Sequence, residues 1–200
     1  MPDALAWTPA YELDHWKGLD RCQHFQTLDE KHRILAVPAF APEHPHVVVS
    51  IGGGRWAGDL RLYTAGHNRV LIDPLADHFT NGDVPEGVEK VAAYARAIPM
   101  PSNMTDVAFC IETLDHCDDL PDLQQSVREL ERIMKPGGVL FFQLPVRNVP
   151  RLGHPIAKTL IAPADVEKLF RFSDVLLSKI RDHEDRSEVW LVLQRQEAWE

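Results

Sequence analysis

Residues 47–54 read Val47-Val48-Val49-Ser50-Ile51-Gly52-Gly53-Gly54. The first five are apolar except for Ser50, as expected of a strand that a parallel sheet buries on both faces. Glycines follow at once, and a backbone without side chains can approach a ligand closely. A helix that starts after such a turn presents unpaired N–H groups at its first residues. The segment therefore predicts a buried strand, a tight turn and a short helix, with a ligand at the turn.

An acidic residue stands at the spacing that such a ligand site requires. Asp73 lies 19 residues after Gly54 and ends a second strand candidate, residues 69–72. A carboxylate beside the glycine turn can accept hydrogen bonds from a ribose diol, which predicts an adenosine-type ligand. The alternative is a tight strand–helix turn in which Asp73 only caps a helix. Gly52, Gly54 and Ala57 fit a dinucleotide fingerprint, G-x-G-x-x-A, and also the shorter G-x-G turn typical of S-adenosylmethionine sites.

The rest of the chain continues this alternation of strands and helices. Further strands are expected at residues 91–95, 106–111 and 139–144, and helices at 56–65, 120–134 and 164–172. The last two strands, 174–180 and 188–193, are separated by too few residues for a crossover helix, so they should pair antiparallel. The pattern predicts an α/β fold with a doubly wound, mostly parallel seven-stranded sheet and an antiparallel C-terminal strand pair.

The N-terminal part is expected to differ from this domain. Residues 11–35 have loosely helical periodicity, and three prolines between 37 and 45 indicate a linker. We therefore expect an N-terminal helical extension and linker over residues 1–45 and the ligand-binding domain over residues 46–200.

Composition limits the functions that this domain can have. The 200 residues are 44% hydrophobic and 26% charged, which suits one globular domain, and no apolar run is long enough to span a membrane. A net charge of −9 argues against nucleic acid as the partner. Cys22, Cys110 and Cys117 are odd in number and lack metal-like spacing, so we expect reduced thiols, a cytoplasmic location and no metal site. The oligomeric state is left open.

Three further segments give the chain a family resemblance. They are Ala97-Ile98-Pro99-Met100-Pro101, Thr105-Asp106-Val107-Ala108-Phe109-Cys110 with Leu114-Asp115-His116, and Leu130-Glu131-Arg132-Ile133-Met134-Lys135-Pro136-Gly137-Gly138-Val139-Leu140. Together with the glycine turn, they resemble the class I S-adenosylmethionine-dependent methyltransferases over about residues 46–195. The resemblance implies the same doubly wound fold, S-adenosylmethionine as cofactor and methyl transfer as the activity.

Site residues follow from the resemblance, position by position. Gly52 and Gly54 would line the methionine portion of the cofactor, and Asp73 would bind the ribose hydroxyls. The remaining implied cofactor contacts are Pro74 and Leu75 at adenine, Ala95 and Arg96 at the adenine edge, and Cys110 and Ile111 at the sulfonium. Family members often carry an acid where Ser50 stands and a third glycine where Trp56 stands. They also often carry an acid or amide near the adenine amine, where this chain has Tyr94 or Ala95, so it departs from the family at three places.

Methyl transfer to an alcohol or phenol benefits from a general base. His116, after the fourth strand, is the first candidate because its pKa lies near working pH. Glu112 is the alternative base or a substrate anchor. Arg147 and Asn148, after the fifth strand, are candidates for holding an anionic or sugar-like acceptor, and His15 is a candidate lid residue.

The preferred function is methyl transfer to a small-molecule acceptor, with oxygen slightly favoured over nitrogen. Ser50 and Trp56 favour a second hypothesis, a non-catalytic methyltransferase-like binding protein. A third, an NAD(P)-dependent oxidoreductase, is disfavoured because the C-terminal third contains no second nucleotide-binding half.

Overall fold

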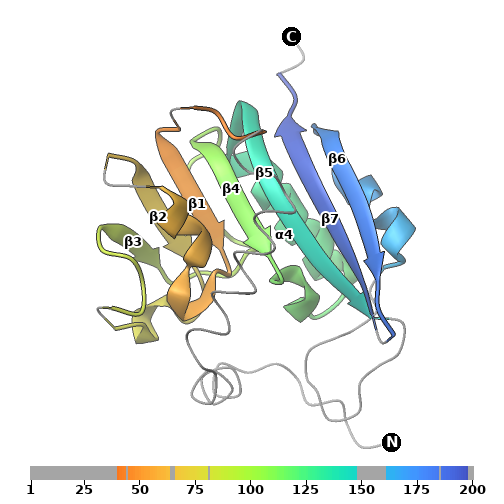
Figure 1. Cartoon of the computed structure of the whole chain (residues 1–200), viewed down its shortest axis with the longest axis horizontal. Helices are drawn as coiled ribbons and strands as arrows, with labels where there is room; N and C mark the ends of the chain where they lie inside the picture. Colours follow the sequence, from red (N-terminus) through yellow and green to blue (C-terminus); the bar gives the residue numbers. More distant parts are fainter. Residues whose placement is uncertain are drawn as a thin grey trace, which may run out of the picture.

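The computed structural model describes residues 40–43, 45–63, 66–80, 82–147, 161–184 and 186–197. Over these residues, seven strands form one sheet in the order β3-β2-β1-β4-β5-β7-β6 (Figure 1). The strands are β1 Val47–Ile51, β2 Asn68–Ile72, β3 Val88–Val91, β4 Thr105–Ile111, β5 Met134–Arg147, β6 Ser173–Asp182 and β7 Arg186–Arg195. Strands β1 to β5 are parallel to one another, whereas β7 is antiparallel to β5 and β6. The predicted fold class is confirmed.

The order of the strands fixes where a ligand can bind. From β1, the chain first adds β2 and β3 on one side and then crosses to β4 and β5 on the other. Ligands of open α/β sheets bind where the strand order reverses, outside the carboxyl ends of the strands. In Figure 1 this is the lower edge of the sheet, where β1 and β4 end.

The central strands of the sheet are buried on both faces, which explains why they are largely apolar. Val49 and Ile51 on β1 point to the face covered by α4, Leu120–Ile133. Val48 points to the opposite face, where Leu60 and the stacked rings of Phe109 and Phe141 lie, with ring centroids 5.1 Å apart. The alternation of side chains along β1 therefore assigns Ser50 to the same face as Val48.

Helix α4 begins and ends close to the predicted limits of 120–134. The side chain of Asp119 caps it by accepting a hydrogen bond from the backbone N–H of Asp122 at 2.8 Å. The strand β5 follows directly at Met134, so the helix ends before Pro136. Because a residue that precedes proline disfavours the helical conformation, Lys135 explains why the helix does not continue.

Two of the predicted helices have a different form. The segment predicted at 56–65 contains two short 3-10 helices, η1 Gly54–Trp56 and η2 Gly58–Leu62, and the one at 164–172 is the 3-10 helix η5 Pro163–Leu169. The other 3-10 helices are η3 Ala76–His78 and η4 Leu114–His116. Ala57 has a left-handed backbone, with φ 35°, and this interrupts helix formation between η1 and η2.

Strand limits also differ from the prediction. The third strand was placed at 91–95, but β3 ends at Val91, where it pairs with Ile72. Half of its residues are exposed, because β3 is an edge strand, and an exposed edge lacks the apolar run that sequence reasoning looks for. The fifth strand is longer than 139–144 at both ends, because Met134 pairs with Thr105 of β4 and residues 145–147 pair with β7.

Candidate functional site

The turn that follows β1 has backbone angles that glycine adopts more readily than other residues. Gly52 and Gly54 have φ values of 65° and 63°, in the left-handed region. The N–H of Gly52 donates to the carbonyl of Ile72 at 2.7 Å, which holds the turn against the end of β2. A Cβ at position 52 would lie 2.8 Å from Cβ of Thr113 and closer still to its terminal atoms. Both the backbone angle and the available space therefore require glycine at this position.

Asp73 lies directly beside this turn. One carboxylate oxygen accepts a hydrogen bond from the N–H of Gly54 at 3.1 Å, and the other accepts from the N–H of Leu75 at 2.8 Å. Only 6% of Asp73 is exposed, so the side chain is directed into the protein and not toward bulk water. The carboxylate and the glycine turn thus form the arrangement that the sequence predicted. Each oxygen of a carboxylate accepts more than one hydrogen bond, so the same group can also bind a diol.

A second acid, Asp83, holds Arg55, the residue that follows the last glycine of the turn. Arg55 donates to Oδ1 of Asp83 through Nη2 at 2.8 Å and through Nε at 3.2 Å. The N–H and hydroxyl of Thr80 donate to the other oxygen of Asp83 at 2.8 and 2.7 Å. Burial by itself would raise the pKa of Asp83, but the hydrogen bonds from Thr80 and Arg55 outweigh it and the pKa is lowered. The carboxylate of Asp73 therefore holds Gly54, and that of Asp83 holds Arg55.

A third carboxylate lies beneath the turn, and sequence reasoning missed it. The Ser50 hydroxyl donates to Oδ2 of Asp59 at 2.6 Å, and neither residue is more than 5% exposed. Burial raises the pKa of Asp59 to about 6, although the hydrogen bond from Ser50 opposes this change. The apolar neighbours of Asp59 in the sequence gave no sign that η2 would bring it under β1.

The end of β4 forms the other wall of the site. Glu112 follows β4 with a left-handed backbone, φ 52°, and its N–H donates to the carbonyl of Gln143 on β5 at 3.2 Å. Thr113 was also missed by sequence reasoning. Its hydroxyl donates to the backbone oxygens of Ile51 and Ile111 at 2.9 and 3.1 Å, which joins the ends of β1 and β4. Left-handed residues other than glycine cluster at functional sites because other contacts must compensate for their strain.

Replacing Glu112 by glycine tests this strain. Because glycine adopts φ 52° without steric cost, we expect Glu112→Gly to raise the free energy of unfolding by about 1 kcal/mol, measured by urea titration. If Glu112 also serves the reaction, turnover falls in the same variant. Asn103 has φ 59° and is exposed, and Asn103→Gly is the matched control for the backbone change. A loss of stability in Glu112→Gly alone would show that the side chain contributes more than the strain costs.

The predicted base, His116, is the last residue of η4. Its backbone N–H donates to the carbonyl of Thr113 at 3.2 Å, and its side chain is half-buried. It therefore lies in the loop that follows Glu112 and Thr113, at the carboxyl end of β4. The structure brings both candidate bases to one edge of the sheet, and their roles stay predictions.

The predicted adenine contacts, Pro74, Leu75, Ala95 and Arg96, differ in how far they are exposed. Leu75 is 2% exposed and packs in the core, whereas Pro74 is half-buried at the edge. Ala95 and Arg96 follow β3 in a loop, since β3 ends earlier than predicted. The guanidinium of Arg96 stacks over the ring of Tyr94 at 4.4 Å and lies 3.4 Å from the carboxylate of Asp122. A contact between Arg96 and a ligand would compete with these two interactions.

Cys110 and Ile111 end β4 beside the glycine turn. Cys110 is fully buried, and burial raises the pKa of its thiol, so its side chain faces the core. Ile111 is half-buried on the opposite face. Arg147 is the last residue of β5, but its side chain, Asn148 and His15 lie outside the described residues, as does the predicted helix at 11–35.

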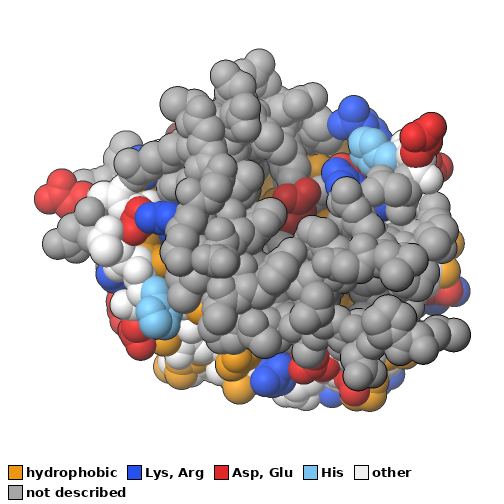
Figure 2. All heavy atoms as spheres, turned by 90° about the horizontal axis from the view of Figure 1, so that it is seen from below, with side chains coloured by type: hydrophobic (Ala, Val, Ile, Leu, Met, Phe, Trp, Pro, Cys, Tyr) orange, Lys and Arg blue, Asp and Glu red, His pale blue; other side chains and the backbone are white. Residues whose placement is uncertain are grey.

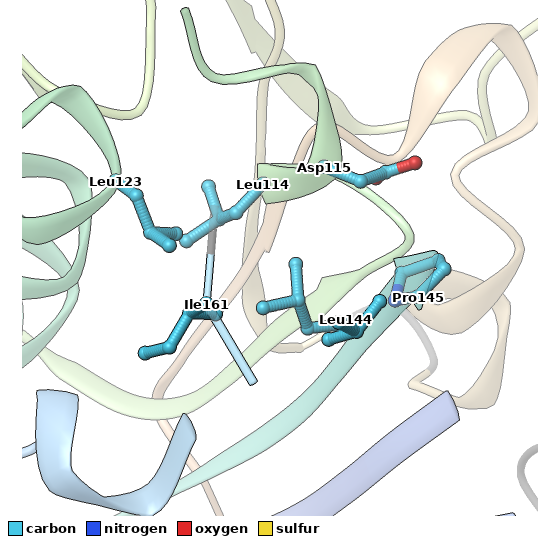
Figure 3. A pocket seen from close by; sticks show the side chains of 7 residues that line it. Leu114, Asp115, Leu123, Leu144, Pro145 and Ile161 are labelled. Atoms are coloured by element: carbon cyan, nitrogen blue, oxygen red, sulfur yellow. The ribbon is translucent and has the colours of Figure 1, made fainter. Parts of the chain in front are cut away.

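A small apolar hollow lies between η4 and the end of β5. Figure 3 shows that Leu114, Leu123 and Leu144 converge on it, whereas the carboxylate of Asp115 points away. Pro145, Val146 and Ile161 complete the lining. Figure 2 looks onto this edge of the molecule from below and shows acidic side chains near its centre and around its margin. The described part of the edge therefore combines carboxylates with one apolar hollow.

Two further properties concern the described residues. No three His, Cys, Asp or Glu side chains among them are grouped as a metal site would require. None of the described helices has the length and the apolar composition needed to cross a membrane.

Comparison with known proteins distinguishes between the two ligands that the glycine turn fits, a dinucleotide and S-adenosylmethionine. Residues 47–142 match the family model described as a methyltransferase domain. Residues 47–142 belong to that family. The predicted resemblance to class I methyltransferases is confirmed, and the matched segment of the methyltransferase domain includes the glycine turn, Asp73, Glu112 and His116.

A curated relative and two solved structures are similar to this chain. The ubiquinone biosynthesis O-methyltransferase of Ralstonia nicotianae is 32% identical over 146 residues, which are 68% of this chain and 59% of the relative. The chain thus spans about three fifths of that relative's length. The N-methyltransferase NodS of Bradyrhizobium japonicum WM9, in complex with S-adenosyl-L-homocysteine, superposes with a TM-score of 0.62 at 16% identity, covering 84% of this chain and 87% of NodS. The [4+2]-cyclase SpnF superposes with 0.61 at 15% identity, covering 80% and 79%. The two superpositions show a shared fold.

Proposed function

We propose that this chain binds S-adenosylmethionine at the glycine turn and transfers the methyl group to a small-molecule acceptor. The observation that carries the proposal is the buried carboxylate of Asp73, 3.1 Å from the N–H of Gly54. A nucleoside can place its ribose hydroxyls on that carboxylate while its substituent follows the glycine backbone. The family match over the same residues and the S-adenosyl-L-homocysteine complex of NodS support this choice of ligand.

The residues of this chain would mainly position the reactants. When bound, the cofactor supplies an activated methyl group on a sulfonium. Gly52 and Gly54 leave room for its methionine portion, and Asp73 holds the ribose. Glu112, Thr113 and His116 follow β4 at the same edge, where an acceptor must lie to attack the methyl carbon in line with the breaking C–S bond. Positioning of this kind contributes up to roughly 7–11 kcal/mol to catalysis in well-oriented reactions.

An oxygen acceptor is our preferred substrate class. The O-methyltransferase of Ralstonia nicotianae supports it, as does a half-buried histidine at the end of β4 that can accept the proton of a hydroxyl group. The net charge of −9 disfavours nucleic-acid substrates.

Replacement of the histidine tests its role as the base. We expect His116→Ala to lower turnover by 10²-fold or more and to change the affinity for S-adenosylmethionine by less than threefold, because a general base contributes roughly 10²–10⁴-fold to rate. Single-turnover kinetics and calorimetry measure the two effects separately. His78, an exposed histidine on η3, provides the matched control His78→Ala. Unchanged turnover in His116→Ala would remove the residue from the mechanism.

The proposed activity is tested by mass-spectrometric detection of S-adenosylhomocysteine. The purified chain is incubated with S-adenosylmethionine and a panel of phenols, alcohols and amines. We expect product formation with at least one hydroxyl-bearing acceptor. Cofactor binding without product from any class of acceptor would favour a non-methylating role, and the superposition on a [4+2]-cyclase shows that the fold accommodates another reaction.

A further inference from the structure

A buried carboxylate, that of Asp59, lies beneath the glycine turn, and no cation among the described residues forms an ion pair with it. Asp59 is 5% exposed, and the ion pairs formed by the described residues do not include it. Its hydrogen bonds come from the Ser50 hydroxyl at 2.6 Å and from the N–H of Leu60 at 3.1 Å. Burying a carboxylate is unfavourable unless charge compensates it. The folded chain therefore retains a costly group at this place.

The charge is connected to the turn through one hydroxyl group. A Cβ on Gly53 would collide with Oγ of Ser50, so this hydroxyl lies directly against the middle of the turn. The N–H of Ala57 donates to the carbonyl of Gly53 at 3.1 Å, which ties the start of η2 to the same residue. The Ser50 hydroxyl thus lies between the buried carboxylate of Asp59 and Gly53 of the turn, where a ligand would bind.

We propose that Asp59 is a positioning residue whose negative charge, carried to the glycine turn through Ser50, selects a cationic ligand over its neutral counterpart. This inference rests on the proposed function. S-adenosylmethionine carries a sulfonium, whereas S-adenosylhomocysteine has a neutral sulfur at the same place. A buried charge acts strongly on nearby charges because little water screens it. Asp59 and Ser50 together would therefore bind S-adenosylmethionine more tightly relative to S-adenosylhomocysteine.

Among Asp59, Tyr63 and Cys110, Asp59 is the group that titrates at mildly acidic pH. Tyr63 interacts with Asp59 electrostatically, and burial raises the pKa of Tyr63 to about 12. Cys110 also interacts with Asp59, and burial raises the pKa of its thiol. The ring of His67 packs edge-on against the ring of Tyr63, with ring centroids 5.6 Å apart. Because the pKa of Asp59 is raised to about 6, folding stability falls as pH rises from about 4 to 6, and Asp59→Asn removes that loss.

Calorimetry with both ligands tests the proposal on the full chain. At pH 7.5, we expect Asp59→Asn to weaken S-adenosylmethionine about tenfold more than S-adenosylhomocysteine, while the thermal midpoint is unchanged or higher. At pH 5, the wild type should approach the variant, since Asp59 is then protonated. Asp106→Asn is the matched control, because Asp106 is a half-buried carboxylate that pairs with Lys135 at the opposite end of the sheet.

The outcomes separate this inference from the proposed function. Equal weakening of both ligands together with a lower thermal midpoint would show a purely structural role and overturn it. A ratio of the two affinities in the wild type that stays constant from pH 5 to 8 would overturn it independently, even if Asp59→Asn did not fold. Binding of neither ligand by the wild type would instead contradict the proposed function, and this inference with it.

Discussion

Asp73→Asn should reduce the affinity for S-adenosylmethionine at least 100-fold. The carboxylate accepts hydrogen bonds from the N–H groups of Gly54 and Leu75, so it both shapes the turn and offers acceptors to the ribose. An asparagine at this position turns an NH₂ group toward one of these amides, which leaves a buried donor without an acceptor. Such a loss costs about 1–3 kcal/mol of stability, and each of the two lost ribose hydrogen bonds to the charged carboxylate costs about 1.5–3 kcal/mol of binding. Calorimetry and urea unfolding measure the two effects.

Asp83→Asn is the matched control for Asp73→Asn. Asp83 also secures the turn, but its hydrogen bonds come from Arg55 and Thr80, whereas Asp73 accepts from the glycine backbone itself. We expect the two variants to lose similar stability, while Asp83→Asn binds the cofactor within about tenfold of the wild type. Equal losses of affinity in both variants would mean that Asp73 supports the turn without contacting the ligand.

Gly52→Ala should destabilise the chain and abolish cofactor binding. Alanine at φ 65° costs about 1–2 kcal/mol, and its Cβ would collide with Thr113, which adds about 1–3 kcal/mol. Because Thr113 joins β1 to β4, relief of the collision must move one strand end or the turn itself. The expected result is a decrease of about 3 kcal/mol in the free energy of unfolding, measured by urea titration, with no detectable heat of cofactor binding.

Gly137→Ala separates the two causes. Gly137 has φ 76°, and nothing lies within 4 Å of the position that its Cβ would take. Gly137→Ala should therefore cost only the backbone penalty of about 1–2 kcal/mol and leave cofactor affinity unchanged. If Gly52→Ala were no more destabilising than this control, the turn would have space that the structure does not show.

The fold could be predicted because its strongest signals are local. Residues 47–51 are apolar throughout except for Ser50, and a parallel strand buried on both faces has this pattern. The short gap between the last two strands excluded a crossover helix, and β6 and β7 indeed pair antiparallel. The spacing of Gly54 and Asp73 predicted a contact that the hydrogen bond between them confirms.

The rest depended on contacts between residues far apart in the sequence. β3 is an exposed edge strand, so its apolar pattern is weak and its limits were misplaced. The segment after the glycines was expected to form one helix, but the left-handed Ala57 divides it into η1 and η2. Asp59 comes under Ser50 only through this division, and Thr113 reaches Gly52 only once β1 and β4 are paired. Neither residue carries a motif that would have identified it.

A crystal structure of the chain with S-adenosylhomocysteine would show whether the ribose binds to Asp73. We expect electron density for the nucleoside over Gly52 to Gly54, with both ribose hydroxyls about 3 Å from the carboxylate of Asp73. Density for the ligand at another place, or a ribose that makes no contact with Asp73, would contradict this expectation.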